Sequence, residues 1–142
     1  MDAIDNILNR VSARLLKEPY PSNEEMNKVY KAALRAPDHA WLRPSSFIQV
    51  TGDGIKELSK IFEEYAKTIP NIKDEIITKY KNAPFRAPMI IILVSTFKDH
   101  PKVPGIEQKL STAASAQNIL LSLSALGYSA IWRTGKLAFN PY

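Results

Sequence analysis

The 142-residue sequence predicts a mixed domain of helices and strands. Apolar residues recur at helical spacing in several segments, most clearly between Ser22 and Pro37 and over residues 106–126. Two shorter stretches, 47–51 and 89–94, have the apolar and β-branched composition of strands. Ser22-Asn23-Glu24-Glu25 is a capping box, in which Ser and Glu satisfy free N–H groups of a first helical turn.

A short opening helix is predicted from one apolar face, made by Ile4, Ile7, Leu8 and Val11. This spacing places Arg10 and Ser12 at or just beyond the helix end. The second helix starts at the capping box and continues to Pro37, with Arg35 in its last turn, where a cation suits the helix dipole.

The central part of the chain alternates between strand and helix. Residues 47–51 form a strand that ends at Gly52, and helices follow over residues 55–69 and 72–81. Residues 89–94 lack polar alternation, so this run predicts a strand that is covered on both faces and lies in the middle of the sheet.

A long helix over residues 106–126 follows, with Gly127 as its stop. Residues 128–132 are then predicted to be extended and to form a third strand, with Arg133 directly after its end. Three strands are few for this much helix. Asn140-Pro141 is a helix-start signature one residue before the chain stops. We therefore expect a C-terminal helix and strand to be missing from an otherwise single domain over residues 1–142.

Composition excludes several classes of site. The chain has 19 Lys+Arg and 14 Asp+Glu, and this net charge of +5 attracts anions without selecting one kind. The absence of cysteine excludes disulfides and thiolate chemistry. Asp38, His39 and His100 lack a metal-binding spacing, so no metal is predicted. No secretory signal or membrane-spanning run is found, and a cytoplasmic protein is expected.

Two basic clusters bracket the chain, Arg10-Val11-Ser12-Ala13-Arg14 and Trp132-Arg133-Thr134-Gly135. Each combines arginine, whose planar fork matches phosphate oxygens, with a hydroxyl donor. Together they predict one shared anion if the fold brings them together. Taken singly, Arg10 and Arg14 are better explained as surface charges and Trp132 as a core residue. Only the order of the arginines with Arg133 favours an anion site.

Five motifs occur in a fixed order along the chain. They are Arg10-x-Ser12-x-Arg14, residues 35–39, residues 82–88, Lys102-Val103-Pro104 followed by Glu107-Gln108, and residues 127–135. In this order they resemble the FMN-dependent nitroreductase family, specifically its small YdjA-like branch of NAD(P)H nitroreductases. The resemblance covers essentially the whole chain.

The resemblance implies an α+β fold with a central, mostly antiparallel sheet flanked by helices. It also implies a homodimer with one FMN in each of two clefts at the subunit interface. NADH or NADPH reduces the flavin, and a nitroaromatic, quinone or similar small molecule accepts the electrons in a ping-pong reaction. Because the cofactor carries the chemistry, no catalytic side chain is predicted.

The resemblance also implies which residues bind the cofactors. The expected FMN contacts are Arg10, Val11, Ser12, Arg14, Arg35, His39, Trp132, Arg133 and Thr134. The stretch expected to meet the nicotinamide cofactor is Ser122, Leu123, Ser124, Ala125, Leu126 and Gly127. Arg43-Pro44-Ser45 stands where this branch usually has Gln-Pro-Trp, which predicts a different substrate preference.

Two other functions are compatible with the sequence. The first is a non-catalytic remnant of the fold that binds flavin weakly or not at all. The second is a basic module for nucleic acid or phosphate, which ranks last because the sequence lacks a basic-aromatic surface motif. The lysines of residues 56–81 have acidic residues interspersed among them, which is typical of solvated helix faces. Neither nucleic acid nor a membrane is therefore expected as a partner.

Overall fold

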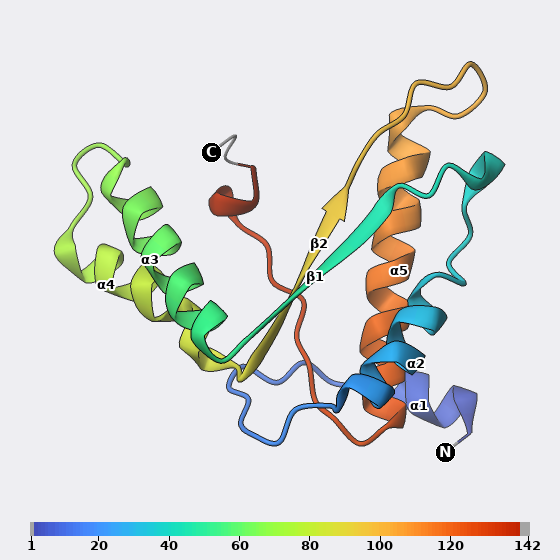
Figure 1. The fold of residues 1–142 in the computed structure, drawn as a ribbon, viewed down its shortest axis with the longest axis horizontal. Coiled ribbons are helices and arrows are strands. Elements are labelled where there is room, and N and C mark those ends of the chain that lie inside the picture. Colours follow the sequence, from blue (N-terminus) through green and yellow to red (C-terminus); the bar gives the residue numbers. More distant parts are fainter. Residues whose placement is uncertain (1, 140–142) are drawn as a thin grey trace. The chain divides into compact units, whose positions relative to one another are not determined.

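The computed structural model describes residues 2–139 and confirms the α+β fold class. The helices and strands, in chain order, are α1 (Ala3–Asn9), α2 (Asn23–Ala33), β1 (Ser45–Thr51), α3 (Asp53–Lys67), α4 (Asp74–Asn82), β2 (Met89–Ser95) and α5 (Gly105–Ala125) (Figure 1). Short 3-10 helices are η1 (His39–Trp41), η2 (Ala83–Arg86) and η3 (Lys136–Phe139). The helix predicted to start at Asn140-Pro141 lies outside the described residues.

The chain divides into two compact units. The first unit comprises residues 2–13, 20–48 and 91–132, and the second comprises residues 14–19, 49–90 and 133–139. Each unit has its own small group of buried residues, which are described separately below.

The core of the first unit lies between α2 and α5, which run side by side (Figure 1). The predicted capping box is present at Ser22 and Glu25, and it starts α2 with its apolar face toward α5. The buried apolar residues of the two helices are Met26, Val29, Ala33, Ala116, Ile119 and Leu123. The helix ends at Ala33, so Arg35 lies just beyond the last turn rather than in it.

Polar side chains on the buried face of α5 form hydrogen bonds to the first residue of β1, the last residue of β2 and the loop after β2. The Gln108 side chain donates to the Lys98 carbonyl at 2.8 Å and accepts from the Lys98 N–H at 3.0 Å. The Thr112 hydroxyl lies 3.0 Å from the hydroxyls of both Ser45 and Ser95. These buried groups are paired, which avoids the cost of leaving a polar atom without a partner.

The second unit is built around a helical hairpin of α3 and α4 (Figure 1). The two helices meet through an edge-to-face contact between Tyr65 and Tyr80, with ring centroids 5.6 Å apart. The buried Ser59 hydroxyl donates to the Lys81 carbonyl at 2.7 Å, near the end of α4. Both helices agree with the predicted segments to within a few residues.

The sheet differs from the prediction. β1 and β2 pair as a two-stranded antiparallel sheet, so β2 has no second neighbouring strand among the described residues. Most β2 side chains are half-buried, and Val94 is exposed. The prediction that β2 is the middle strand and covered on both faces is therefore wrong for residues 2–139. An apolar run shows that a strand can be buried, but it does not say how many strands pair with it.

The third predicted strand is also corrected. Residues 128–132 make a single parallel bridge, between Ala130 and Ser12, and do not form a strand. A strand needs a ladder of successive pairs, and this segment has a partner at one position only.

The opening helix α1 has the predicted apolar face, but the structure leaves that face exposed. Ile4, Ile7 and Leu8 are 62%, 53% and 75% exposed, whereas Asn6 on the same helix is buried. The Asn6 side chain donates to the Leu121 carbonyl of α5 at 2.9 Å. A polar contact, rather than the apolar face, therefore attaches α1 to α5 within the described part of the chain.

Candidate cofactor-binding site

Arg10 lies at the end of α1, beside a pocket of about 200 Å³. The pocket is lined by Asn9, Arg10, Val11, Leu120, Ser124, Gly127, Tyr128, Ser129 and Ala130. The Nη1 atom of Arg10 is buried and has no hydrogen-bond partner among the described residues. A buried guanidinium N–H without a partner is costly, and an anionic oxygen in the pocket would supply the partner that it lacks. Arg10 therefore fits a phosphate group.

The N-terminal cluster and the segment before the C-terminal cluster lie side by side. Ser12 and Ala130 form the parallel bridge, and the Ala13 N–H donates to the Ala130 carbonyl at 3.4 Å. This pairing fixes the position of the Ser12 segment relative to Ser129 and Ala130, which line the pocket. The fold thus joins two segments that are more than a hundred residues apart in the sequence.

Gly127 determines where the chain goes after α5. Its N–H donates to the Ser124 carbonyl at 3.0 Å, and the next N–H, of Tyr128, donates to the Leu123 carbonyl at 2.9 Å. This pair of bonds is a Schellman motif, which requires a left-handed residue at the position of Gly127. Gly127 has a φ of +86°. The sharp turn directs Tyr128 and Ala130 along the pocket.

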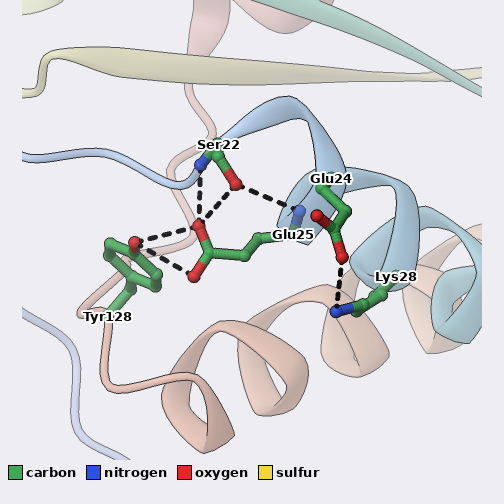
Figure 2. A network of polar contacts seen from close by, with 5 residues as sticks. All are labelled: Ser22, Glu24, Glu25, Lys28 and Tyr128. Atoms are coloured by element: carbon green, nitrogen blue, oxygen red, sulfur yellow. Dashed lines mark hydrogen bonds and ion pairs between the residues drawn. The ribbon is translucent and has the colours of Figure 1, made fainter.

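Tyr128 connects the pocket wall to the start of α2 (Figure 2). Its hydroxyl donates to the Glu25 carboxylate, with distances of 3.2 and 3.4 Å to the two oxygens. The Oε2 atom of Glu25 also accepts from the backbone N–H and the hydroxyl of Ser22, each at 2.8 Å. The capping box therefore has a second role, since it fixes the side chain of a pocket residue.

The same contacts shift two pKa values. The hydrogen bonds from the Ser22 backbone and hydroxyl lower the pKa of Glu25, and the contact with Tyr128 adds to this effect. Partial burial raises the pKa of Tyr128, and the hydrogen bond to Glu25 raises it further. The carboxylate therefore stays ionised and the phenol stays protonated near neutral pH, so the phenol remains the donor.

His39 lies at the opposite end of α5. Its Nδ1 atom is 2.6 Å from Oε2 of Glu107, in the first turn of that helix. The loop around His39 is held by Asp38, whose two carboxylate oxygens accept from the N–H groups of Leu42 and Arg43 at 3.1 and 2.9 Å. The Arg43 guanidinium lies over the Trp41 ring, 5.1 Å from its centroid.

The pocket and His39 are far apart within one chain. Glu107 and Ser124 lie near opposite ends of α5, and at 1.5 Å per residue this corresponds to about 25 Å along the helix axis. Figure 1 shows α1 beside the C-terminal end of α5, and η1, which begins at His39, lies near the N-terminal end. Arg10 and His39 therefore belong to two separate places on the first unit.

The other predicted contacts divide between the units. Val11, Ser12, Arg35 and Trp132 are exposed residues of the first unit. Arg14, Arg133 and Thr134 are exposed residues of the second unit, where the Arg14 carbonyl accepts from Arg86 at 2.9 Å. In the predicted nicotinamide stretch 122–127, Leu123 is buried, and Ser124 and Gly127 line the pocket with Arg10.

Sequence reasoning did not select Tyr128 or Glu107 as site residues. Tyr128 follows the helix-stop glycine directly, and Glu107 belongs to the motif at residues 102–108, so both had a local signal. Their partners, Glu25 and His39, are 103 and 68 positions away. Only the packing of α2 and η1 against α5 brings these pairs together.

Within residues 2–139, the histidine and carboxylate side chains form no cluster of three or more that could hold a metal ion. None of the described helices is long and apolar enough to cross a membrane.

The fold, the Nη1 atom of Arg10 that lacks a partner within residues 2–139, and the ordered motifs agree with one class of protein. The chain belongs to the nitroreductase family, because the model of that family matches residues 7–140. The chain is 37% identical over 141 residues to the protein of Escherichia coli strain K12 that carries the name "Putative NAD(P)H nitroreductase YdjA". That match covers 99% of this chain and 76% of the relative. The family predicted from the motifs is thereby confirmed.

Two solved structures show the same fold. The nitroreductase-like family protein from Bacillus cereus has a TM-score of 0.83 at 21% identity, covering 99% of this chain and 74% of that one. A nitroreductase with bound FMN from Bacteroides fragilis has a TM-score of 0.65 at 17% identity, covering 89% of this chain and 66% of that one.

Proposed function

We propose that this chain is an FMN-dependent oxidoreductase that transfers electrons from NADH or NADPH to a nitroaromatic, quinone or similar small acceptor. Membership in the nitroreductase family and the name of the Escherichia coli relative support the activity. The FMN in the Bacteroides fragilis structure, which shares this fold, supports the cofactor. The observation that carries the proposal is the buried Arg10 Nη1, which has no partner among the described residues.

In this proposal Arg10 and Ser12 hold the phosphate and ribityl end of FMN, as their donors suit anionic and hydroxyl oxygens. The helices α1 and α5 both end near the pocket, and their C-terminal carbonyls carry partial negative charge. Arg10 is the cationic residue in the pocket lining, and it offsets this partial negative charge. When bound, the flavin accepts a hydride from the nicotinamide and passes electrons to the acceptor.

We propose further that the working form is a homodimer. About 25 Å of helix separates Glu107, which contacts His39, from Ser124, which lines the pocket with Arg10. This separation is longer than one FMN molecule, so in this proposal Arg10 and His39 of one chain do not share an FMN. Two copies resolve this, because Arg10 of one copy and His39 of the other can line the same cleft. The exposed apolar face of α1, together with Ile106 and Leu110 of α5, supplies surface for such an association.

Mixing two inactive variants tests the shared cleft. Arg10→Gln and His39→Ala are each expected to bind FMN poorly when pure. In a mixed dimer one cleft carries both changes and the other carries neither. After subunit exchange, half of the dimers are mixed and half of their clefts are intact, so about a quarter of the FMN sites return. If mixing restores no FMN binding, the cleft is not shared between copies.

The function itself is tested by the visible spectrum of the purified chain with added FMN, before and after anaerobic addition of NADPH. A bound-flavin spectrum that bleaches is the expected result. FMN that separates completely from the protein on gel filtration would contradict the proposal. Lys28→Gln serves as a control for the loss of one positive charge, because Lys28 is exposed and forms an ion pair with Glu24 on the surface of α2 (Figure 2).

Steady-state kinetics test the order of the reaction. If donor and acceptor occupy one cleft in turn, double-reciprocal plots at several acceptor concentrations will be parallel. Intersecting lines would show that donor and acceptor bind together, and would contradict the ping-pong order.

A further inference from the structure

We infer that Glu107 is a positioning residue that fixes the tautomer of His39, so that the Nε2 atom of His39 accepts a hydrogen bond from the bound cofactor. The first part of this inference concerns the protein alone. The second part rests on the proposed function, because it assigns a role to His39 toward FMN.

The geometry determines which ring nitrogen carries hydrogen. An ionised carboxylate can only accept hydrogen bonds, and Oε2 of Glu107 is 2.6 Å from Nδ1 of His39. Nδ1 must therefore carry the proton and donate it to Glu107. In the neutral ring the other nitrogen, Nε2, then has a lone pair and no hydrogen.

Backbone hydrogen bonds fix the chain around both Glu107 and His39. Glu107 lies in the first turn of α5, and the backbone N–H of Glu107 donates to the Pro104 carbonyl at 3.0 Å. On the other side, Asp38 fixes the loop through its bonds to Leu42 and Arg43. The backbone on each side of the contact is thereby held in place.

The Nε2 atom of His39 has no protein partner within residues 2–139, and the His39 side chain is 55% exposed. A neutral Nε2 with a lone pair attracts a donor and repels a phosphate oxygen. The group of FMN that meets His39 is therefore a hydroxyl of the ribityl chain or an N–H of the ring. Phosphate recognition is left to Arg10, at the other end of α5.

The second histidine provides an internal comparison. The backbone N–H of Lys102 donates to Nδ1 of His100 at 3.2 Å, so this nitrogen is an acceptor and the proton of the neutral ring is on Nε2. The structure therefore assigns opposite tautomers to the two histidines of this chain.

Long-range ¹H–¹⁵N correlation spectra of the ¹⁵N-labelled full chain test the assignment, since protonated and unprotonated ring nitrogens differ widely in ¹⁵N shift. Spectra are recorded without FMN at alkaline pH, where imidazole rings are neutral. The His100→Gln variant identifies the two sets of signals. We expect a protonated Nδ1 on His39 and a protonated Nε2 on His100. A His39 ring with its proton on Nε2 would overturn the inference.

Two substitutions of Glu107 distinguish the loss of its hydrogen bond to His39 from a general change in the structure. Glu107→Gln keeps an oxygen acceptor and is expected to keep the Nδ1–H form of His39. Glu107→Ala removes the acceptor and is expected to shift His39 toward the Nε2–H form, while His100 keeps its shifts. An unchanged His39 tautomer in Glu107→Ala would overturn the positioning role.

The cofactor part has its own readout. Addition of FMN to the wild-type chain is expected to move the Nε2 shift of His39 and leave His100 unchanged. Glu107→Ala should weaken FMN binding by about three- to tenfold, the effect of one hydrogen bond, and Glu107→Gln should restore most of it. If the wild-type chain binds no FMN, the proposed function fails while the tautomer result stands. If FMN binds without moving Nε2 of His39, the cofactor part of the inference is wrong.

Discussion

Replacing Gly127 by alanine should loosen the turn that forms one wall of the pocket. Gly127 has a φ of +86°, which residues with a Cβ adopt at a cost. A Cβ placed at this position would meet no atom within 4 Å. The change therefore adds backbone strain to the folded state and no steric clash.

The expected size follows from two opposing effects. Strain from the left-handed backbone costs about 1–2 kcal/mol for a residue with a Cβ. Alanine also restricts the unfolded chain, which favours the folded state by about 0.4–1 kcal/mol. The net loss in the free energy of unfolding is therefore about 1 kcal/mol.

Gly105→Ala is the matched control. A Cβ at Gly105 also meets nothing within 4 Å, and Gly105, at the start of α5, does not have the left-handed backbone of Gly127. Both variants restrict the unfolded chain equally, so the difference between them isolates the strain of about 1–2 kcal/mol. Urea unfolding followed by circular dichroism measures both. Equal stability of the two variants would refute the left-handed turn at Gly127.

Three further predictions concern the pocket, the core and the capping box. Arg10→Gln should weaken FMN binding by about ten- to a hundredfold, since a hydrogen bond to a charged group contributes about 1.5–3 kcal/mol; fluorescence titration measures this, and Lys28→Gln should leave the affinity unchanged. Met26→Ala should lower the free energy of unfolding by about 2–5 kcal/mol, because Met26 is 1% exposed between α2 and α5; Leu15→Ala, at a residue 76% exposed, should change it by less than about 0.5 kcal/mol. The lowered pKa of Glu25 means that its contribution is present above the unfolded-state pKa and is lost as pH falls through the folded-state value. Wild-type stability should thus drop as pH falls below the ordinary glutamate pKa, and Ser22→Ala should show a shallower drop over the same range; an unchanged pH slope in Ser22→Ala would contradict the role of Ser22.

Local signals explain which elements could be predicted. The capping box at Ser22 and Glu25 and the stop at Gly127 are where they were expected, because each depends on contacts within one or two turns of chain. The helical segments follow from apolar spacing in the same way. The failures were the middle position of β2 and the strand at 128–132, and both depend on which distant segment supplies a pairing partner.

In the candidate site too, local features could be predicted from the sequence and long-range contacts could not. Arg10 and Ser12 were selected for their side-chain chemistry. The structure adds that the Nη1 atom of Arg10 is buried without a partner among residues 2–139 and that Ser12 pairs with Ala130. The flavin contacts themselves remain predictions. Glu107 and Tyr128 could not be selected, since neither residue type indicates a site without knowledge of the group that it faces.

The sequence by itself determined the family, the order of the helices and the residue types able to bind a phosphate, because ordered motifs and local periodicity are properties of the chain. Only the tertiary structure decided that Arg10 and His39 lie at opposite ends of α5, that Glu25 fixes Tyr128, and that Glu107 meets His39. The two contacts join residues that are 103 and 68 positions apart in the sequence. They arise from helix packing, which buries apolar faces without regard to the distance between residues along the chain.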